Sequence, residues 1–225
     1  MGASPPRAIA AALLALAAAA CSGTTTGAGT APGTPDPARA RASAPRYEVR
    51  RQPYTAADVH FMAGMIAHHA QAIRMARMAP SHGAREDIRI LCERIVVAQR
   101  DEIRTMQAWL RERDEHAPDV DSTFTRVTMH GAHDALMPGM LTDDELARLD
   151  AARGPEFDRL FLAFMIRHHE GALTMVDELF TSYGAAQDDV VFKLASDIFA
   201  DQSSEIERMQ SMLDAMTSAT GSSPQ

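Results

Sequence analysis

The chain has 225 residues, of which 46% are hydrophobic, and it carries 22 basic against 30 acidic residues for a net charge of −8. This acidic balance argues against nucleic acid and anionic lipid as partners. Residues 53–217 form the only long segment with regular apolar spacing, and this length is sufficient for one sizeable core.

The N-terminal segment predicts export. Residues 1–20 place Arg7 before an apolar run, the pattern of a secretory signal peptide that is too short to span a bilayer. Cys21 follows, so the segment resembles a bacterial lipoprotein signal, in which this cysteine is acylated, although Ala18 replaces the usual leucine. Lipidation of Cys21 would place the protein on the outer face of the cytoplasmic membrane, whereas a plain signal peptide would leave it secreted. Residues 21–52 are rich in Gly, Ala, Thr, Ser and Pro, which predicts a disordered tether.

The following residues predict helices. Apolar residues recur at a period near 3.6, with few glycines or prolines, at roughly 55–79, 84–115, 155–182 and 187–217. Thr55 is suited to cap the first helix and Pro155 to the first turn of the third. Thr142 and Glu145 have capping-box spacing and predict a further short helix. These lengths predict an all-α, four-helix bundle of two tandem helical hairpins joined by a long crossover, with residues 218–225 as a disordered tail.

The two hairpins are copies of one another. Residues 58–75 match residues 158–175 at a constant offset of 100, and each copy contains a pair of adjacent histidines. A segment of the second helix recurs at an offset of 103. The helical domain at 53–217 therefore divides into repeat one at 55–115, a crossover at 116–154 and repeat two at 155–217.

The duplicated histidines mark the first candidate site. At 100° per residue, His69 and His169 lie at the centres of the apolar stripes of their helices, and His68 and His168 lie at the edges. Other polar residues on or beside the buried faces are Asp58, Asp158, Gln99, Glu102, Gln202 and Glu205. Buried polar groups need partners, so the core is expected to hold a polar cluster around an approximate twofold axis.

Two interpretations of this cluster remain open. In the first, a hydrogen-bond network of histidine, glutamine and glutamate fixes the packing of the helices. In the second, the histidines hold a metal ion together with Met65 and Met165, which stand four residues before His69 and His169.

A second candidate site lies in the crossover. Met129, His130, His133, Met137 and Met140 fall within twelve residues around a Pro-Gly turn. Thioether and imidazole groups without a thiolate pair suit Cu(I), and by analogy Ag(I), better than zinc or magnesium. Methionine also packs well in irregular loops, so the alternative is a loop sealed onto the bundle by flexible apolar side chains.

Several enzyme classes lack their motifs in this sequence. No Glu-x-x-His of the di-iron carboxylate bundles, no His-Glu-x-x-His, no phosphate-binding glycine loop and no Cys-x-x-Cys occurs. A binding protein is therefore favoured over a catalyst.

The motifs resemble those of a bacterial exported family, catalogued as domain of unknown function 305, over about residues 53–215. They are Phe61-Met62 through Met75, Phe157 through Ala172, Gln99-x-x-Glu102-Ile103-x-x-Met106, Gln202-x-x-Glu205-Ile206-x-x-Met209 and Met137-Pro138-Gly139-Met140. The resemblance implies a ferritin-like helical bundle that is exported, with some members linked to copper or silver handling through methionine and histidine. It points to both histidine pairs, to Met65 and Met165, and to the crossover positions.

The sequence thus predicts an exported, lipid-anchored bundle that binds copper, above all Cu(I), as a buffer or chaperone. One alternative is a structural or protein-interaction module with a buried hydrogen-bond network, and another is a metal-dependent redox enzyme. The expected partners are a metal ion and, only through the lipid on Cys21, the membrane. The sequence does not identify a protein partner.

Overall fold

The computed structural model describes residues 53–128 and 136–221, and in these ranges it contains five helices. They are α2 (Ala56–Ala76), α3 (Glu86–Arg111), α4 (Asp143–Ala151), α5 (Pro155–Thr181) and α6 (Asp189–Gly221). Two short antiparallel strands, β1 (Asp119–Val120) and β2 (Val127–Thr128), form a hairpin in the crossover. The all-α architecture is confirmed, and the small β-hairpin is an addition that the sequence did not predict.

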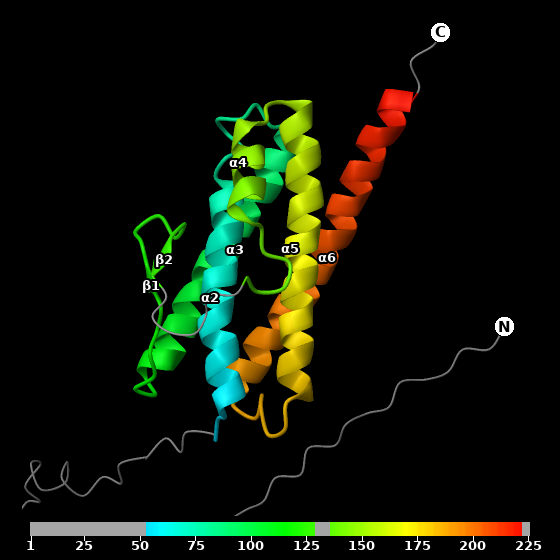
Figure 1. The fold of residues 1–225 in the computed structure, drawn as a ribbon. Coiled ribbons are helices and arrows are strands. Elements are labelled where there is room, and N and C mark those ends of the chain that lie inside the picture. The colour runs from blue at the N-terminus through cyan, green and yellow to red at the C-terminus, as the bar shows by residue number, and fades with distance from the viewer. Residues whose placement is uncertain (1–52, 129–135, 222–225) are drawn as a thin grey trace, which may run out of the picture. The chain divides into compact units, whose positions relative to one another are not determined.

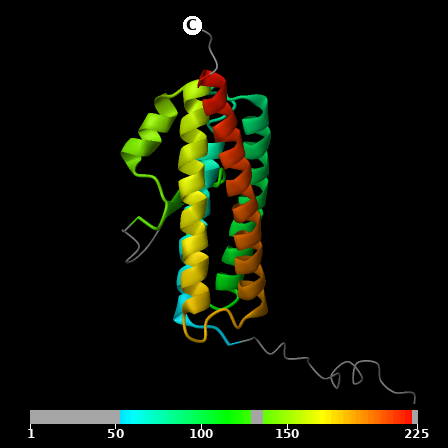
Figure 2. The ribbon, with the colours of Figure 1, turned by 90° about the vertical axis from the view of Figure 1, so that its right-hand side faces the viewer.

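The four long helices form two hairpins that meet along their first helices. α2 packs against α3, α5 packs against α6, and α2 and α5 form the contact between the hairpins (Figures 1 and 2). α4 packs on α5. Since α2 and α5 carry the two histidine pairs, this architecture brings one histidine of each pair, His68 and His168, to the contact between the repeats.

The helix starts follow the local sequence. Thr55 and Thr142 each form a capping box, with Asp58 and Glu145 respectively, and Pro155 occupies the first position of α5. α6 continues to Gly221, so the tail expected to be disordered from residue 218 begins inside a helix. No helix in the described ranges combines the length and the apolar character that a membrane crossing requires. The predicted signal peptide, Cys21 and the tether lie outside the described residues.

Asp58 and Asp158 lie at the ends of the bundle rather than beside the histidines, which corrects the expectation that they join the polar cluster. The Asp58 carboxylate accepts the N–H of Ala186 at 2.7 Å, and that of Asp158 accepts the N–H of Arg85 at 3.3 Å. Each aspartate thus ties one hairpin to the connecting loop of the other. Ten residues separate each aspartate from the nearest histidine pair, about 15 Å along a helix.

The C-terminal part of the crossover packs against α2 and α5. The side chain of Gln71 donates to the carbonyl of Leu141 at 2.9 Å and accepts its N–H at 2.7 Å. Gly139 has a φ of +76° and lies directly on Gly171, where a β-carbon would come within 2.0 Å of the Pro138 carbonyl oxygen. Only glycine at position 171 therefore permits this approach.

We expect Gly171→Ala to lower the free energy of unfolding by about 1–3 kcal/mol, because the added carbon meets backbone atoms that cannot move aside. Gly64→Ala is the matched control, since its β-carbon meets only the flexible ends of Met137, at 3.2 Å, and Met175, at 3.4 Å. Urea melts of the two variants measure the difference. Equal stabilities would show that the crossover does not rest on α5 in solution.

Candidate metal centre

All four paired histidines are fully buried, at 0% exposure. The rings of His68 and His168 lie against one another where α2 meets α5, in a tilted arrangement with centroids 3.8 Å apart and planes inclined by 41°. The prediction that these two lie at the edges of their stripes is wrong. That prediction treats each helix as having one apolar stripe, but α2 packs against two neighbouring helices and α5 against three, so most of their circumference is buried.

His69 and His169 are held by glutamates from the second helix of their own hairpin. His69 Nε2 donates to Glu102 at 2.7 Å, and His169 Nε2 donates to Glu205 at 2.7 Å. The histidine–glutamate part of the expected network is therefore present. The glutamine part is not, because both amide atoms of Gln99 and the Oε1 of Gln202 have no hydrogen-bond partner.

The ring nitrogens that have no hydrogen-bond partner distinguish His68 and His168, the central pair, from the other two histidines. His68 Nε2 donates to the carbonyl of Pro138 at 3.0 Å, which leaves its Nδ1 unpartnered, and neither ring nitrogen of His168 has a partner. Burial lowers the pKa of His68 from 6.5 to about 3 and that of His168 well below 6.5. Both rings are therefore neutral at physiological pH, and each offers a lone pair that a metal ion can accept.

The orientation of these rings is typical of metal ligands. A ligating histidine usually donates its second N–H to a carboxylate or a backbone carbonyl, which fixes the tautomer. His69 and His169 have the carboxylate arrangement and His68 the carbonyl arrangement, and the Nδ1 of each is unpartnered. Nevertheless, no three His, Cys, Asp or Glu side chains of the described residues gather as a ligand set. Any metal here needs ligands of another type beside the central pair.

Two methionine side chains lie beside the turn of α2 that precedes His68. Gly64 stands one turn before His68, and a β-carbon there would lie 3.2 Å from Met137 Sδ and 3.4 Å from Met175 Cε. The missing side chain at Gly64 therefore leaves room for two methionine side chains, one from the crossover and one from α5. Met175 was not predicted as a site residue. Its position seven residues after His168, on the same face of α5, was the available signal.

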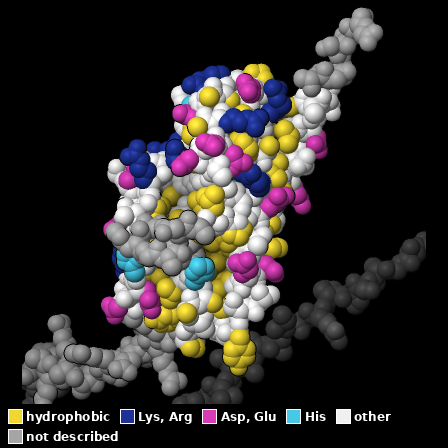
Figure 3. Space-filling model, in the orientation of Figure 1, with side chains coloured by type: hydrophobic (Ala, Val, Ile, Leu, Met, Phe, Trp, Pro, Cys, Tyr) yellow, Lys and Arg dark blue, Asp and Glu magenta, His cyan; other side chains and the backbone are white. Residues whose placement is uncertain are grey.

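A pocket of about 160 Å³ opens onto these methionines. Its lining includes His60, Met137, Pro138, Met175 and Glu178. The crossover runs over α2 and α5 on the side facing the viewer in Figure 1, and on the same face histidine side chains reach the surface among apolar and acidic ones (Figure 3). The pocket therefore reaches the residue whose carbonyl holds His68.

The other predicted metal ligands lie in different environments. Met65 and Met165 are fully buried in the core. Met140 is partly buried and closes the crossover turn by donating its N–H to the carbonyl of Met137, but it does not line the pocket. The remaining crossover residues, Met129, His130 and His133, lie outside the described residues. Burial raises the pKa of the Cys92 thiol, which keeps that side chain protonated.

Acid should destabilise the bundle through His68 and His168. Because their folded pKa values are lowered, the unfolded chain takes up protons below pH 6.5 that the folded chain does not. The stabilisation is complete above pH 6.5 and is lost as the pH falls from 6.5 toward 3, at about 1.4 kcal/mol per pH unit for each group. Urea melts at several pH values measure this slope. The double variant His68→Leu/His168→Leu should show a shallower slope, and an unchanged slope would contradict the assignment.

Solved structures of similar proteins share this fold. A DUF305 protein from Streptomyces coelicolor, named as a candidate secreted protein, is 27% identical with a TM-score of 0.60, covering 72% of this chain and 94% of its own. A DUF305 fragment from Deinococcus radiodurans is 29% identical with a TM-score of 0.61, covering 72% and 99%.

CopM, solved in Cu(II)-bound and Cu(I)-bound forms, is 29% identical in both. The TM-scores are 0.55 and 0.52, and the alignments cover 70% and 72% of this chain and 96% and 98% of CopM. No curated protein matches the chain. The family model described as domain of unknown function (DUF305) matches residues 58–213, and the chain accordingly belongs to the DUF305 family.

Proposed function

We propose that this protein is exported and binds copper, chiefly Cu(I), and silver by the same chemistry, as a metal buffer or chaperone. Support comes from its similarity to CopM, whose structures were solved with Cu(I), Cu(II) and silver bound. The observation that carries the proposal is the His68–His168 pair, whose rings are in contact, fully buried and left with three unpartnered nitrogens.

Leaving these nitrogens unpartnered costs free energy. A buried polar group without a hydrogen bond costs about 1–3 kcal/mol, so the pair is a destabilising feature unless a ligand binds to it. A structural role alone would be better served by apolar side chains of similar volume. Neutral imidazole is a ligand for copper, and a bound ion would compensate the nitrogens that the protein leaves without partners.

The nearby methionines define which metal this region suits. Met137 and Met175 bring soft thioether groups to the turn of α2 that precedes His68, and no thiolate is available there. Thioether with imidazole suits Cu(I) and Ag(I), which are soft, better than Zn(II) or Mg(II). The pocket lined by His60 and these methionines also includes Pro138, whose carbonyl accepts the hydrogen bond from His68.

The proposed location rests on the N-terminal sequence. An apolar segment precedes Cys21, and the Streptomyces coelicolor relative is named as a candidate secreted protein. We therefore assign the protein to the outer face of the cytoplasmic membrane, held by a lipid on Cys21. Mass spectrometry of the mature N-terminus would detect this lipid.

A structural role is favoured for the other two histidines by one specific observation. The bonds from His69 to Glu102 and from His169 to Glu205 each connect the two helices of one hairpin. These two positions thus stabilise the hairpins whether or not metal is bound. No observation on the described residues favours the redox-enzyme alternative.

Substituting each member of one adjacent pair separates these roles. We expect His168→Leu to leave the stability of the apo protein unchanged or to raise it by about 1 kcal/mol, because it removes two unpartnered buried atoms. The same change should lower Cu(I) affinity at least tenfold in a chelator competition. His169→Leu should instead lower the free energy of unfolding by about 1–2 kcal/mol, since Glu205 loses its partner. Unaltered copper affinity in folded His168→Leu would refute the proposed centre.

The methionines are tested by a nearly isosteric change. Met137→Leu and Met175→Leu together should weaken Ag(I) and Cu(I) binding while changing stability by less than about 1.5 kcal/mol. Met106→Leu is the matched control, because Met106 is a buried methionine of α3 that does not line the pocket. Isothermal titration with silver gives the affinities. If the control weakens binding as much as the double variant, the loss does not come from this pocket.

A further inference from the structure

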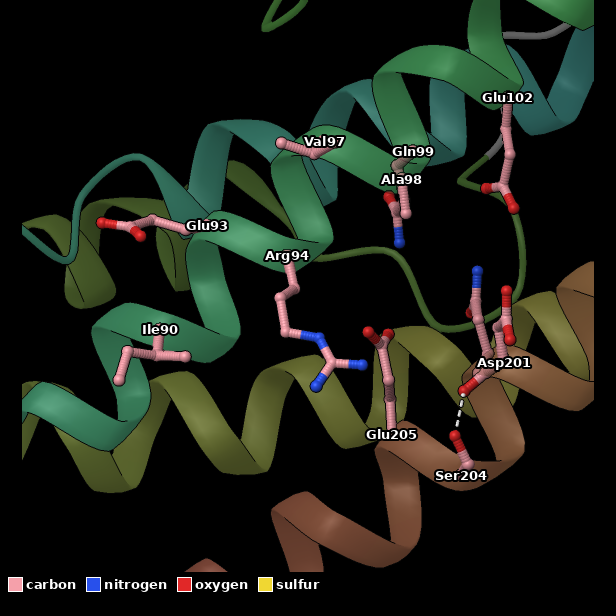
Figure 4. A pocket seen from close by; sticks show the side chains of 11 residues that line it. Ile90, Glu93, Arg94, Val97, Ala98, Gln99, Glu102, Asp201, Ser204 and Glu205 are labelled. Atoms are coloured by element: carbon pink, nitrogen blue, oxygen red, sulfur yellow. Dashed lines mark hydrogen bonds between the residues drawn. The ribbon is translucent and has the colours of Figure 1, made fainter.

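A groove runs between α3 and α6 on a part of the bundle that the copper proposal does not use. These two helices make few direct contacts, and a pocket of about 490 Å³ lies between them (Figure 4). A second pocket, of about 610 Å³, adjoins it and shares Glu102 and Asp201 with it. Along α6 the two extend from Asp189 to Glu205, about 24 Å at the rise of a helix.

Two buried amides line this groove, and three of their four polar atoms have no hydrogen-bond partner. Gln99 and Gln202 line the pocket and are each only 3% exposed. Neither the Nε2 nor the Oε1 of Gln99 has a hydrogen-bond partner, and the Oε1 of Gln202 has none. Figure 4 shows the Gln99 amide directed from α3 into the space between the helices. A bound ligand that donates hydrogen bonds is the simplest partner for the two amide oxygens, since leaving each unpartnered costs about 1–3 kcal/mol.

The walls of the groove are acidic. Glu93, Glu102, Asp201 and Glu205 line the first pocket against the single positive charge of Arg94, which points toward Glu205 (Figure 4). The pKa of Asp201 is raised by burial and by the negative charges of Glu102, Glu205 and Asp197, so anionic carboxylates are crowded here. A cation would relieve that repulsion.

A single metal ion does not fit this arrangement. Glu102 and Glu205 already accept hydrogen bonds from His69 and His169. Among the described residues, no three Asp, Glu, His or Cys side chains lie close enough together to hold one ion. The carboxylates are instead distributed along the groove, and apolar side chains stand among them, with Ile90 and Val97 exposed at the rim. The ligand should therefore be long, with several positive charges separated by apolar segments.

We propose that the α3–α6 groove binds a linear aliphatic polyamine. Its ammonium groups bind the carboxylates and the amide oxygens of Gln99 and Gln202, and its methylene segments lie against the apolar side chains of the rim. This site is separate from the proposed copper centre, which opens on Met137 and Met175.

The test is a calorimetric titration of the mature, metal-free protein with spermidine at physiological salt. Binding should be saturable with one site, and 1,8-octanediol, a neutral chain of similar length, should not bind. Competition by magnesium at equal ionic strength should be weak. Spermidine binding that magnesium displaces fully would show diffuse charge attraction and would overturn the proposal, as would the absence of binding.

Substitutions locate the ligand. Asp201→Asn should weaken spermidine binding about fivefold, whereas Glu207→Gln, the same charge change on an exposed residue of α6 outside the groove, should not. Gln99→Leu should also weaken binding, yet raise or preserve the melting temperature, because it removes a buried amide that has no partner. Equal effects of Asp201→Asn and Glu207→Gln would overturn the site. So would binding of a basic peptide but not of spermidine, which would identify the groove as a protein interface.

Discussion

The burial of two neutral imidazoles against one another, where α2 crosses α5, is the constraint around which the neighbouring elements of this structure are arranged. His68 and His168 can be buried with their ring centroids 3.8 Å apart only if neither is charged, and burial ensures this by lowering both pKa values. The surrounding elements each contribute to holding that layer in place. The helices α3 and α6 supply the carboxylates that bind His69 and His169, and the crossover supplies the carbonyl that accepts from His68. The apolar core continues on either side of this polar layer.

The crossover has a structural and a chemical role at once. Its Pro-Gly turn rests on Gly171 so closely that backbone touches backbone, and this contact positions the carbonyl that orients His68. The same turn brings Met137 above Gly64, beside Met175. Gly171 of α5 thus leaves space for the backbone of the turn, and Gly64 of α2 leaves space for the sulfur atom of Met137. The pseudo-symmetric repeats supply the histidines, while the asymmetric crossover supplies the features that differ between the two halves, and this explains why His68 has a partner and His168 has none.

Local signals in the sequence predicted much of this fold. The capping boxes at Thr55 and Thr142, the repeat and the helical periodicity were sufficient for the helices and their pairing into hairpins. The failures come from contacts between distant segments. Helical phase could not show that α2 and α5 are packed on two sides, and it therefore misplaced His68. The partner of Asp58 is a backbone N–H of the other hairpin, 128 residues away. The pairing of Met137 with Met175 likewise requires the path of the crossover, which periodicity does not contain.

In the proposed copper centre, neutral imidazole and methionine thioether together hold the ion. X-ray absorption at the copper edge, measured on the mature protein loaded with one equivalent of Cu(I), tests it most directly. We expect a first coordination shell that contains both nitrogen and sulfur scatterers, with the multiple-scattering pattern of imidazole. A shell of oxygen and nitrogen atoms without sulfur, or one without imidazole scattering, would contradict it.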